Sequence, residues 1–213
     1  MVNCRFCSIA KEPFNRDKPE NRIIACSNDY FSLASVGALV EGWTLVIPRI
    51  HSCSMKDIYI DNQFADFTTK MITALQDSYG PVIAFEHGPN REGSETSCGT
   101  DHAHIHLVPF HSIAQKLDSL NLEWIVCHSS EISEIVGENE YLFYCEFEEQ
   151  SEWKDPIGKV HVLKEPISQF FRRILAQELG CIEKYNYKIY PDNSLTLKTI
   201  DRLQQYFEEK AGG

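Results

Sequence analysis

Apolar positions along the first half of the chain alternate in short stretches and recur at helical spacing in one longer stretch. Between residues 61 and 79 they fall at positions 64, 67, 71, 72, 75 and 79, which predicts an amphipathic helix that Gly80-Pro81 ends. The shorter stretches, bounded by turn residues, predict strands. These strands are two within residues 22–34 and one each over residues 42–48, 81–85 and 102–110.

The second half of the chain continues this mixture of elements. It predicts strands over residues 123–127, 141–147 and 159–163, and helices over residues 168–179 and 195–207. Runs of strands around one helix are typical of the α+β class. We therefore expect an α+β fold, with a mainly antiparallel sheet and one amphipathic helix over residues 1–112. A mixed α/β extension over residues 113–213 is expected to pack on this part.

Composition and charge narrow the classes of function. The 213 residues are 43% hydrophobic and carry a formal net charge of -11, which argues against general nucleic-acid binding but allows a small anionic ligand. No stretch has the roughly 18 apolar residues of a membrane helix, and the first residues lack the pattern of a secretory signal. The eight cysteines are interpreted mostly as reduced, buried side chains. We expect a soluble protein of the cytoplasm.

Residues 102–108 carry the densest candidate chemistry, because they read His-Ala-His-Ile-His-Leu-Val. On a strand, alternate side chains share a face, so His102, His104 and His106 are expected on one surface. Three imidazoles in that arrangement fit a zinc site, nucleophilic catalysis on phosphorus, or a solvated strand face. The spacing alone does not separate these alternatives.

The motif at residues 102–108 resembles the signature of the histidine triad (HIT) superfamily of nucleotide hydrolases and transferases. Residues 41–51, which run from a glycine-led strand to a proline, a basic residue and a histidine, are similar to the flanking strand of that family. The resemblance covers about residues 1–112 and implies a HIT-like catalytic domain there. It implies that His104 is the nucleophile, forming a nucleotidyl-histidine intermediate, and that His106 contacts the phosphate and assists the leaving group.

Several positions depart from the family pattern around the expected phosphate and ribose sites. The resemblance places Cys98 to Asp101 where many members carry a serine or threonine donor, so a Gly99 amide or the Thr100 hydroxyl would replace it. Ser35 stands where relatives often have a ribose-binding asparagine or aspartate. The usual asparagine before the glycine turn is replaced by Glu86 or His87. The expected substrate-binding residues are Ser35, Glu86, His87, Gly99, Thr100 and His106.

A pair of cysteines two residues apart, Cys4 and Cys7, suits tetrahedral thiolate ligation, although such a pair can also simply pack against Phe6. Many bacterial HIT proteins and the related hexose-1-phosphate uridylyltransferases join such a pair to two histidines. The resemblance therefore implies a structural zinc ion as cofactor. Its ligands would be Cys4, Cys7, His51 and His102.

The expected activity is hydrolysis of phosphoanhydrides, phosphoramidates or nucleotidyl adducts, such as dinucleoside polyphosphates. A nucleotidyltransferase or phosphorylase would use the same intermediate, and a module that binds nucleotides without catalysis is the alternative outside the enzyme class. Histidine at position 106, where the uridylyltransferases carry glutamine, favours hydrolysis. The resemblance allows a homodimer. Arg172 and Arg173 open a helix in the extension, where they fit either a polyphosphate contact or a solvated helix face.

Overall fold

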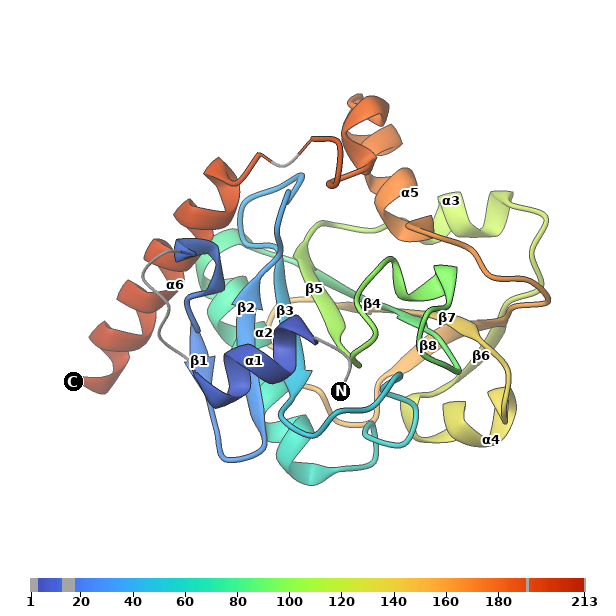
Figure 1. Cartoon of the computed structure of the whole chain (residues 1–213), viewed down its shortest axis with the longest axis horizontal. Helices are drawn as coiled ribbons and strands as arrows, with labels where there is room; N and C mark the ends of the chain where they lie inside the picture. The colour runs from blue at the N-terminus through green and yellow to red at the C-terminus, as the bar shows by residue number, and fades with distance from the viewer. Residues whose placement is uncertain (1–3, 13–17, 191, 213) are drawn as a thin grey trace.

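The fold is built on one antiparallel sheet. The computed structural model describes residues 4–12, 18–190 and 192–212. Within them lie eight strands in the order β1-β2-β3-β5-β4-β7-β8-β6 (Figure 1). Their bounds are β1 Ala25–Cys26, β2 Tyr30–Ala34, β3 Thr44–Pro48, β4 Val82–Gly88, β5 Ile105–Pro109, β6 Ile125–His128, β7 Tyr141–Phe147 and β8 Ile157–Val162.

Helices cover both faces of this sheet, which confirms the α+β prediction. They are α1 Arg5–Lys11, α2 Asn62–Tyr79, α3 Ala114–Ser119, α4 Ile132–Val136, α5 Phe170–Glu178 and α6 Ser194–Ala211. Short 3-10 turns are η1 Pro19–Asn21, η2 Glu95–Ser97, η3 Ser129–Glu131 and η4 Ile182–Tyr185. The sequence did not predict α1, α3 or α4, because helices of five to seven residues are too short to show a period. No described helix is long and apolar enough to cross a membrane.

The helix α2 lies on one face of the sheet. It begins where the Asp61 carboxylate accepts from the Gln63 amide, and it ends at Gly80, whose φ of 96° favours glycine. Its buried side chains pack against even-numbered residues of β3 and β4 and odd-numbered residues of β5 and β7. The helix α6 adds Ile200 and Leu203 to this core, and Figure 1 shows it along the side of the molecule next to α2 and β2.

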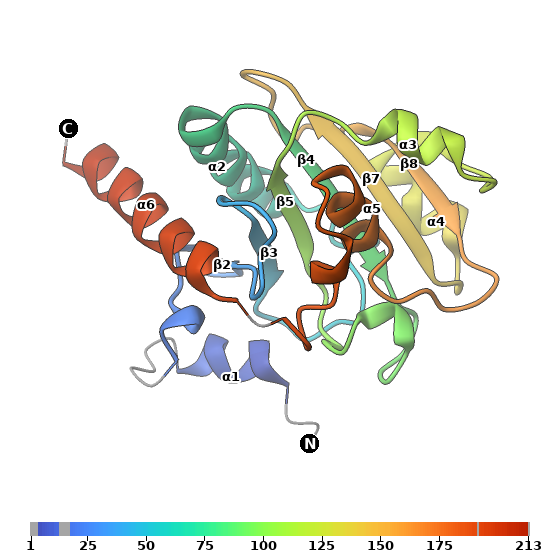
Figure 2. The same cartoon turned by 90° about the horizontal axis from the view of Figure 1, so that it is seen from above.

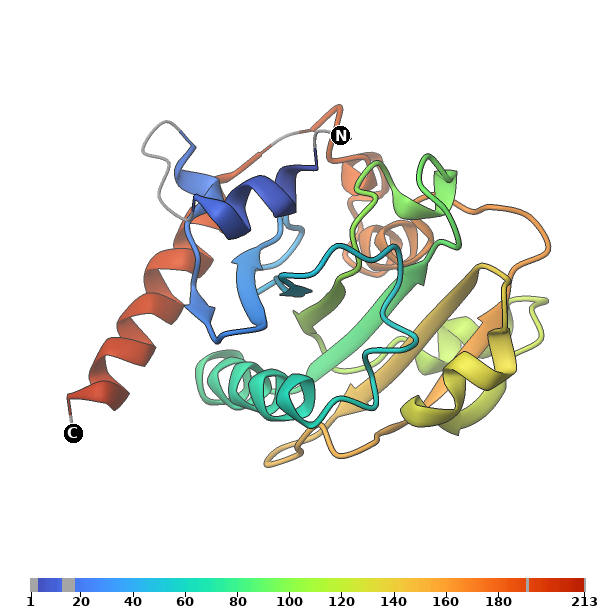
Figure 3. The same ribbon diagram turned by 60° about the horizontal axis from the view of Figure 1, so that its bottom comes forward.

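The opposite face carries two separate hydrophobic clusters. Phe171 and Leu175 of α5 pack over Phe85 and its neighbours on β4 and β7 (Figure 2). Apolar residues of α1 pack over β2 and β3, and Figure 3 shows this short helix lying beside those strands. Strand alternation therefore sends the side chains at positions 85, 87 and 106 to the face between α1 and α5.

The sheet continues from the first part of the chain into the extension. The strand β7 pairs with β4 from Val82↔Phe147 to Gly88↔Tyr141, so residues beyond 112 share the sheet of residues 1–112. The extension also returns to the first strands. The Thr196 hydroxyl donates to the Ser35 carbonyl at 2.7 Å, and the Gly42 amide donates to the Thr199 hydroxyl at 2.8 Å.

The β4–β7 contact generates a stability prediction at Gly88, where an added Cβ would lie 2.1 Å from the ring of the fully buried Tyr141. We expect Gly88→Ala to lower the free energy of unfolding by about 1 to 3 kcal/mol, because the packed ring has no space to move. Urea denaturation measures this, with Gly212→Ala at an open helix end as the control. Equal stability of both variants would contradict the predicted clash.

Candidate catalytic site and metal-binding group

The three histidines of residues 102–108 are divided between two sites. Only His106 lies within β5, where it pairs with Leu45 of β3 and Phe85 of β4. His102 and His104 precede the strand. The ring of the fully buried His102 turns to the cysteines of α1, whereas His104 and His106 line a cavity between α1 and α5. The expectation of one shared surface therefore holds only for His104 and His106.

The imidazole of His104 is held in one tautomer. Its Nδ1–H donates to the His102 carbonyl at 2.7 Å, which leaves the lone pair on Nε2. The ring of Phe6 contacts it edge-on at 5.5 Å between centroids. Burial lowers the pKa of His104 to about 4, so the ring is neutral at physiological pH. A neutral imidazole with a free Nε2 is the form that acts as a nucleophile.

The imidazole of His106 is held in the opposite tautomer. The indole Nε1–H of Trp43 donates to its Nδ1 at 2.9 Å, so a neutral His106 carries its proton on Nε2. The ring stacks on Phe85 with centroids 4.7 Å apart. Burial lowers the pKa of His106 well below its ordinary value. The two rings, 4.9 Å apart, thus offer a lone pair on His104 and a hydrogen-bond donor on His106.

The cavity beside these rings has a volume of about 60 Å³. Its lining comes from α1, the sheet, the loop before β5 and the extension, and contains cations but no carboxylate. The lining residues are Arg5, Phe6, Ser35, Val36, Leu45, His87, Ser97, Cys98, Thr100, His104, His106, Arg172 and Tyr187. In a chain of net charge -11, this distribution makes the cavity a local site for an anion.

The structure brings four of the expected substrate-binding residues to the cavity, namely Ser35, His87, Thr100 and His106. His87 is buried, its Nε2 accepts from the Phe171 amide at 3.4 Å, and burial lowers its pKa to about 3. His87 is therefore neutral there.

Two expected residues lie elsewhere. Strand alternation sends Glu86 to the opposite face, where its carboxylate accepts from the hydroxyls of Tyr59 and Tyr141 at 2.5 Å each and from the Met55 amide at 2.7 Å. Gly99 is not among the lining residues, and its amide donates to the Ser97 hydroxyl at 3.3 Å. The Glu86 carboxylate is thus engaged on the opposite face of the sheet, and the Gly99 amide is engaged by Ser97, which itself lines the cavity.

Residues that sequence reasoning left unassigned complete the cavity. Arg5 lies between Cys4 and Cys7 in the sequence, and its guanidinium donates to Asn21. Tyr187 of the extension also lines the cavity: its hydroxyl donates to the Cys98 carbonyl at 3.0 Å, and its Cβ lies against Gly37. Nothing in the local sequence marks Tyr187, because its contacts arise only when the extension folds back. Arg172 was recognised in the sequence without a settled role, and it lies here.

A candidate metal-binding group lies next to the cavity. One ligand atom each from Cys4, Cys7, His51 and His102 lies within 4.8 Å of the others, so this group could hold a metal ion. Nδ1 of His102 is 3.3 Å from Sγ of Cys4 and 3.5 Å from Sγ of Cys7. Nδ1 of His51 is 3.4 Å from Sγ of Cys7 and 3.2 Å from Nδ1 of His102.

The remaining ring nitrogens of this group are held by the protein. Nε2 of His102 lies 2.8 Å from the Pro48 carbonyl, and Nε2 of His51 lies 3.2 Å from a carboxylate oxygen of Glu92. A proton held on each Nε2 leaves the lone pair on each Nδ1, directed at the shared centre. Such outer hydrogen bonds orient metal-bound histidines in proteins.

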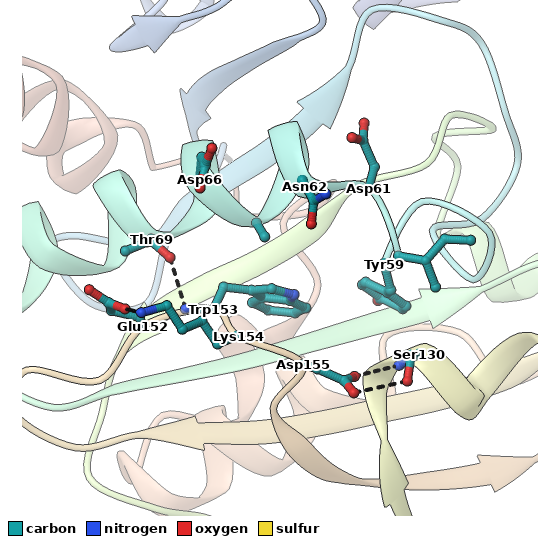
Figure 4. Close-up of a pocket in the computed structure, with 12 residues that line it drawn as sticks. Tyr59, Asp61, Asn62, Asp66, Thr69, Ser130, Glu152, Trp153, Lys154 and Asp155 are labelled. Carbon is teal, nitrogen blue, oxygen red and sulfur yellow. Dashed lines mark hydrogen bonds and ion pairs between the residues drawn. The ribbon is translucent and has the colours of Figure 1, made fainter.

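A larger cavity of about 740 Å³ lies on the other face of the sheet, between α2 and the segment 152–155 (Figure 4). Its charged lining residues are Asp61, Asp66, Glu152, Lys154 and Asp155. Lys154 pairs with Glu152, and the Asp155 carboxylate accepts from the amide and from the hydroxyl of Ser130. With four carboxylates and one paired cation, this cavity repels the anions that the smaller one attracts.

Comparison with known proteins finds similarity in structure only. No protein-family model matches the sequence, and no curated protein matches it. Among solved structures, a HIT-like protein from Bartonella henselae described as involved in cell-cycle regulation is 17% identical. The similarity covers 51% of this chain and 81% of that protein, with a TM-score of 0.39.

Two further solved structures are similar to the same extent. A HIT family hydrolase from Clostridium thermocellum is 18% identical over 53% of this chain and 95% of its own, with a TM-score of 0.38. A hypothetical histidine triad nucleotide-binding protein from Sulfolobus tokodaii is 18% identical over 50% of this chain and 68% of its own, with a TM-score of 0.35. The similarities thus extend over about half of the chain.

The buried Glu86 generates a prediction on stability. Burial raises its pKa to about 7 from an ordinary value of 4.5, against the hydrogen bonds from Tyr141, Tyr59 and Met55. Because the folded pKa is the higher one, protonated Glu86 stabilises the fold fully below pH 4.5, and this contribution is lost as the pH rises through about 7. Glu86→Gln has no such loss.

We therefore expect the stability of the native protein, relative to Glu86→Gln, to fall by up to about 3 kcal/mol between pH 4.5 and 8. Urea denaturation of both proteins across this range, at equal metal content, measures the difference. A difference that stays constant with pH would contradict the raised pKa.

Proposed function

We propose that this chain is a histidine triad enzyme that cleaves a nucleotide at its α-phosphorus through a covalent intermediate on His104. The observation that carries the proposal is the complementary pair of tautomers, with a lone pair on Nε2 of His104 and a proton on Nε2 of His106. The cationic lining of the cavity supports an anionic substrate. The proposed substrates are phosphoanhydrides, phosphoramidates or nucleotidyl adducts, with hydrolysis as the outcome.

In the first step, the lone pair of His104 forms a bond to phosphorus while the bond from phosphorus to the leaving atom breaks. With a phosphoanhydride the leaving oxygen keeps the electron pair of that bond, and the Nε2–H of His106 donates a hydrogen bond to it; an amine leaving group would in addition take a proton from solvent. In the second step, water forms a bond to phosphorus, the phosphorus–nitrogen bond breaks, and its electron pair returns to His104. The proton that water loses passes to a phosphate oxygen or to solvent.

Entry of a nucleotide requires the segment around Tyr187, which we propose covers the site, to move. A volume of about 60 Å³ is far below the roughly 300 Å³ at the lower end of ligand pockets. Tyr187 contributes to this closure from the extension, through its contacts with Cys98 and Gly37. When the segment closes again, it excludes water and strengthens the electrostatic interactions inside. The extension thus takes the role of a cover for the site.

We also propose that the metal-binding group holds a structural zinc ion. Zinc bonds of about 2.3 Å to sulfur and 2.0 Å to nitrogen place tetrahedral ligand atoms roughly 3.3 to 3.8 Å apart. Four of the six separations between the ligand atoms, at 3.2 to 3.5 Å, are close to that geometry, and all six lie within 4.8 Å. Four protein ligands close the coordination shell, so zinc here would tie α1 to the sheet and take no part in the reaction.

The zinc proposal predicts that native protein binds about one equivalent of zinc, which Cys4→Ser largely loses because thiolate ligands are required. Metal analysis by mass spectrometry after dialysis measures this. Cys26→Ser is the matched control, because Cys26 is exposed and lies outside the group. Equal zinc in Cys4→Ser and native protein would refute the assignment.

The catalytic proposal predicts that His104→Ala lowers kcat by roughly 10,000-fold or more, because it removes the nucleophile. Hydrolysis of diadenosine tetraphosphate and of adenosine 5′-phosphoramidate measures the rate, and mass spectrometry of quenched samples detects an acid-labile nucleotidyl adduct. Circular dichroism controls for folding. Absence of both turnover and adduct in the native protein would defeat the enzyme assignment and leave a binding module.

A further inference from the structure

Arg172 occupies a position in the site that the triad motif does not explain. It belongs to α5 of the extension, is only 4% exposed, and lines the same cavity as His104 and His106. No carboxylate among the described residues forms an ion pair with it. A buried guanidinium is costly unless an anion compensates its charge. The site therefore contains a fixed cation whose counter-ion the described protein does not supply.

The guanidinium is held in place on several sides. Its Nε donates to the Tyr185 carbonyl at 2.9 Å and its Nη2 to the Gly37 carbonyl at 2.5 Å. The group lies 4.7 Å from the ring centre of Trp43 and 5.4 Å from that of Tyr187. Within the described part of the chain, the hydrogen bonds of this guanidinium come from Nε and Nη2 and not from Nη1. This arrangement leaves Nη1 as a donor for a ligand. Because the side chain is already ordered, it loses less conformational entropy on binding than a surface arginine would.

The two arginines of the cavity lie on different sides of the reaction. Arg172 faces the indole of Trp43, which donates to Nδ1 of His106. Arg5 lies 5.6 Å from the ring centre of Phe6, and that ring contacts His104 edge-on. Arg172 is thus on the side of His106, where the leaving group departs, and Arg5 is on the side of the nucleophile.

The hydrogen bond from Trp43 limits what His106 can do for that leaving group. Because Nδ1 accepts the indole N–H, it has no lone pair for a second proton. If His106 gave up its Nε2 proton, it would become an imidazolate, which is far too basic to form here. His106 therefore acts as a hydrogen-bond donor and not as a full proton donor. A leaving group must depart with its own negative charge.

We propose that Arg172 binds the departing phosphate, and that the substrates are consequently nucleoside phosphoanhydrides with an anionic leaving group and not phosphoramidates. This inference rests on the proposed function. The bond between the α-phosphorus and the bridging oxygen breaks, its electron pair stays on that oxygen, and the guanidinium stabilises the resulting phosphate anion. An amine leaving group needs a proton and carries no negative charge, so neither His106 nor Arg172 assists its departure.

The test compares two substrates and two neighbouring arginines. The kcat/KM of diadenosine tetraphosphate and of adenosine 5′-phosphoramidate is measured for native protein, Arg172→Gln, Arg172→Lys and Arg173→Gln. Arg173 is the matched control, since it follows on the same helix but is exposed and faces Tyr185. We expect native protein to favour the phosphoanhydride, and Arg172→Gln to lower the ratio of the two values by about 100-fold, the size of effect of a lost oxyanion donor.

Arg172→Lys is expected to give an intermediate ratio, because it keeps the charge but loses the planar guanidinium with its fixed N–H donors. Arg173→Gln is expected to leave the ratio unchanged. A purely structural role of Arg172, in holding the segment around Tyr185, would lower both kcat/KM values equally. That outcome, or a native preference for the phosphoramidate, would overturn the inference.

Binding of inorganic pyrophosphate, measured by calorimetry, separates this inference from the proposed function. We expect native protein and Arg173→Gln to bind pyrophosphate with similar affinity, and Arg172→Gln at least about 10-fold more weakly. If native protein shows no turnover but this pattern holds, the catalytic proposal fails and the anion subsite stands. If Arg172→Gln binds pyrophosphate as well as native protein does, the subsite is refuted whatever the turnover.

Discussion

The arrangement of the site depends on the hydrogen bonds of one buried residue, His102. Its carbonyl accepts from Nδ1 of His104 at 2.7 Å, its Nε2 meets the Pro48 carbonyl at 2.8 Å, and its Nδ1 faces the thiols of α1. The same residue thus fixes the tautomer of the neighbouring imidazole and joins the metal-binding group to β3. Because a fully buried imidazole must satisfy both ring nitrogens, any shift in one contact disturbs the others. The metal-binding group is therefore coupled to the geometry of His104.

The sequence predicted the parts of the fold that have a clear period or a clear stop. The helix expected over residues 61–79 is observed as Asn62–Tyr79, and the strands of residues 1–112 are observed within two or three residues of expectation. The face of the sheet to which each strand residue points was harder to predict. The resemblance pointed to Glu86 and His87 together, but alternation separates them onto opposite faces of β4, and only His87 lines the cavity.

Contacts that depend on tertiary pairing left no local signal in the sequence. Arg172 and Arg173 are adjacent and identical in type, yet one step along a helix rotates a side chain by about 100°. One guanidinium is consequently buried beside Trp43 while the other is exposed. Which of the two turns inward is decided by where α5 lies on the sheet, and that follows from the pairing of β7 with β4. Helical periodicity alone contains none of this information.

In the proposed function, the extension would link substrate choice to closure of the site. Arg172 holds the Tyr185 and Gly37 carbonyls, and Tyr187 packs against Gly37 and donates to Cys98, so the cation and the cover belong to one hydrogen-bonded unit. An anion bound through Nη1 would leave these two hydrogen bonds in place. Movement of the cover would disturb them, so in the proposed mechanism Arg172 is positioned for the leaving phosphate only while the cover is closed. A substrate that satisfies Arg172 only after the cover closes would be favoured over one that holds it open.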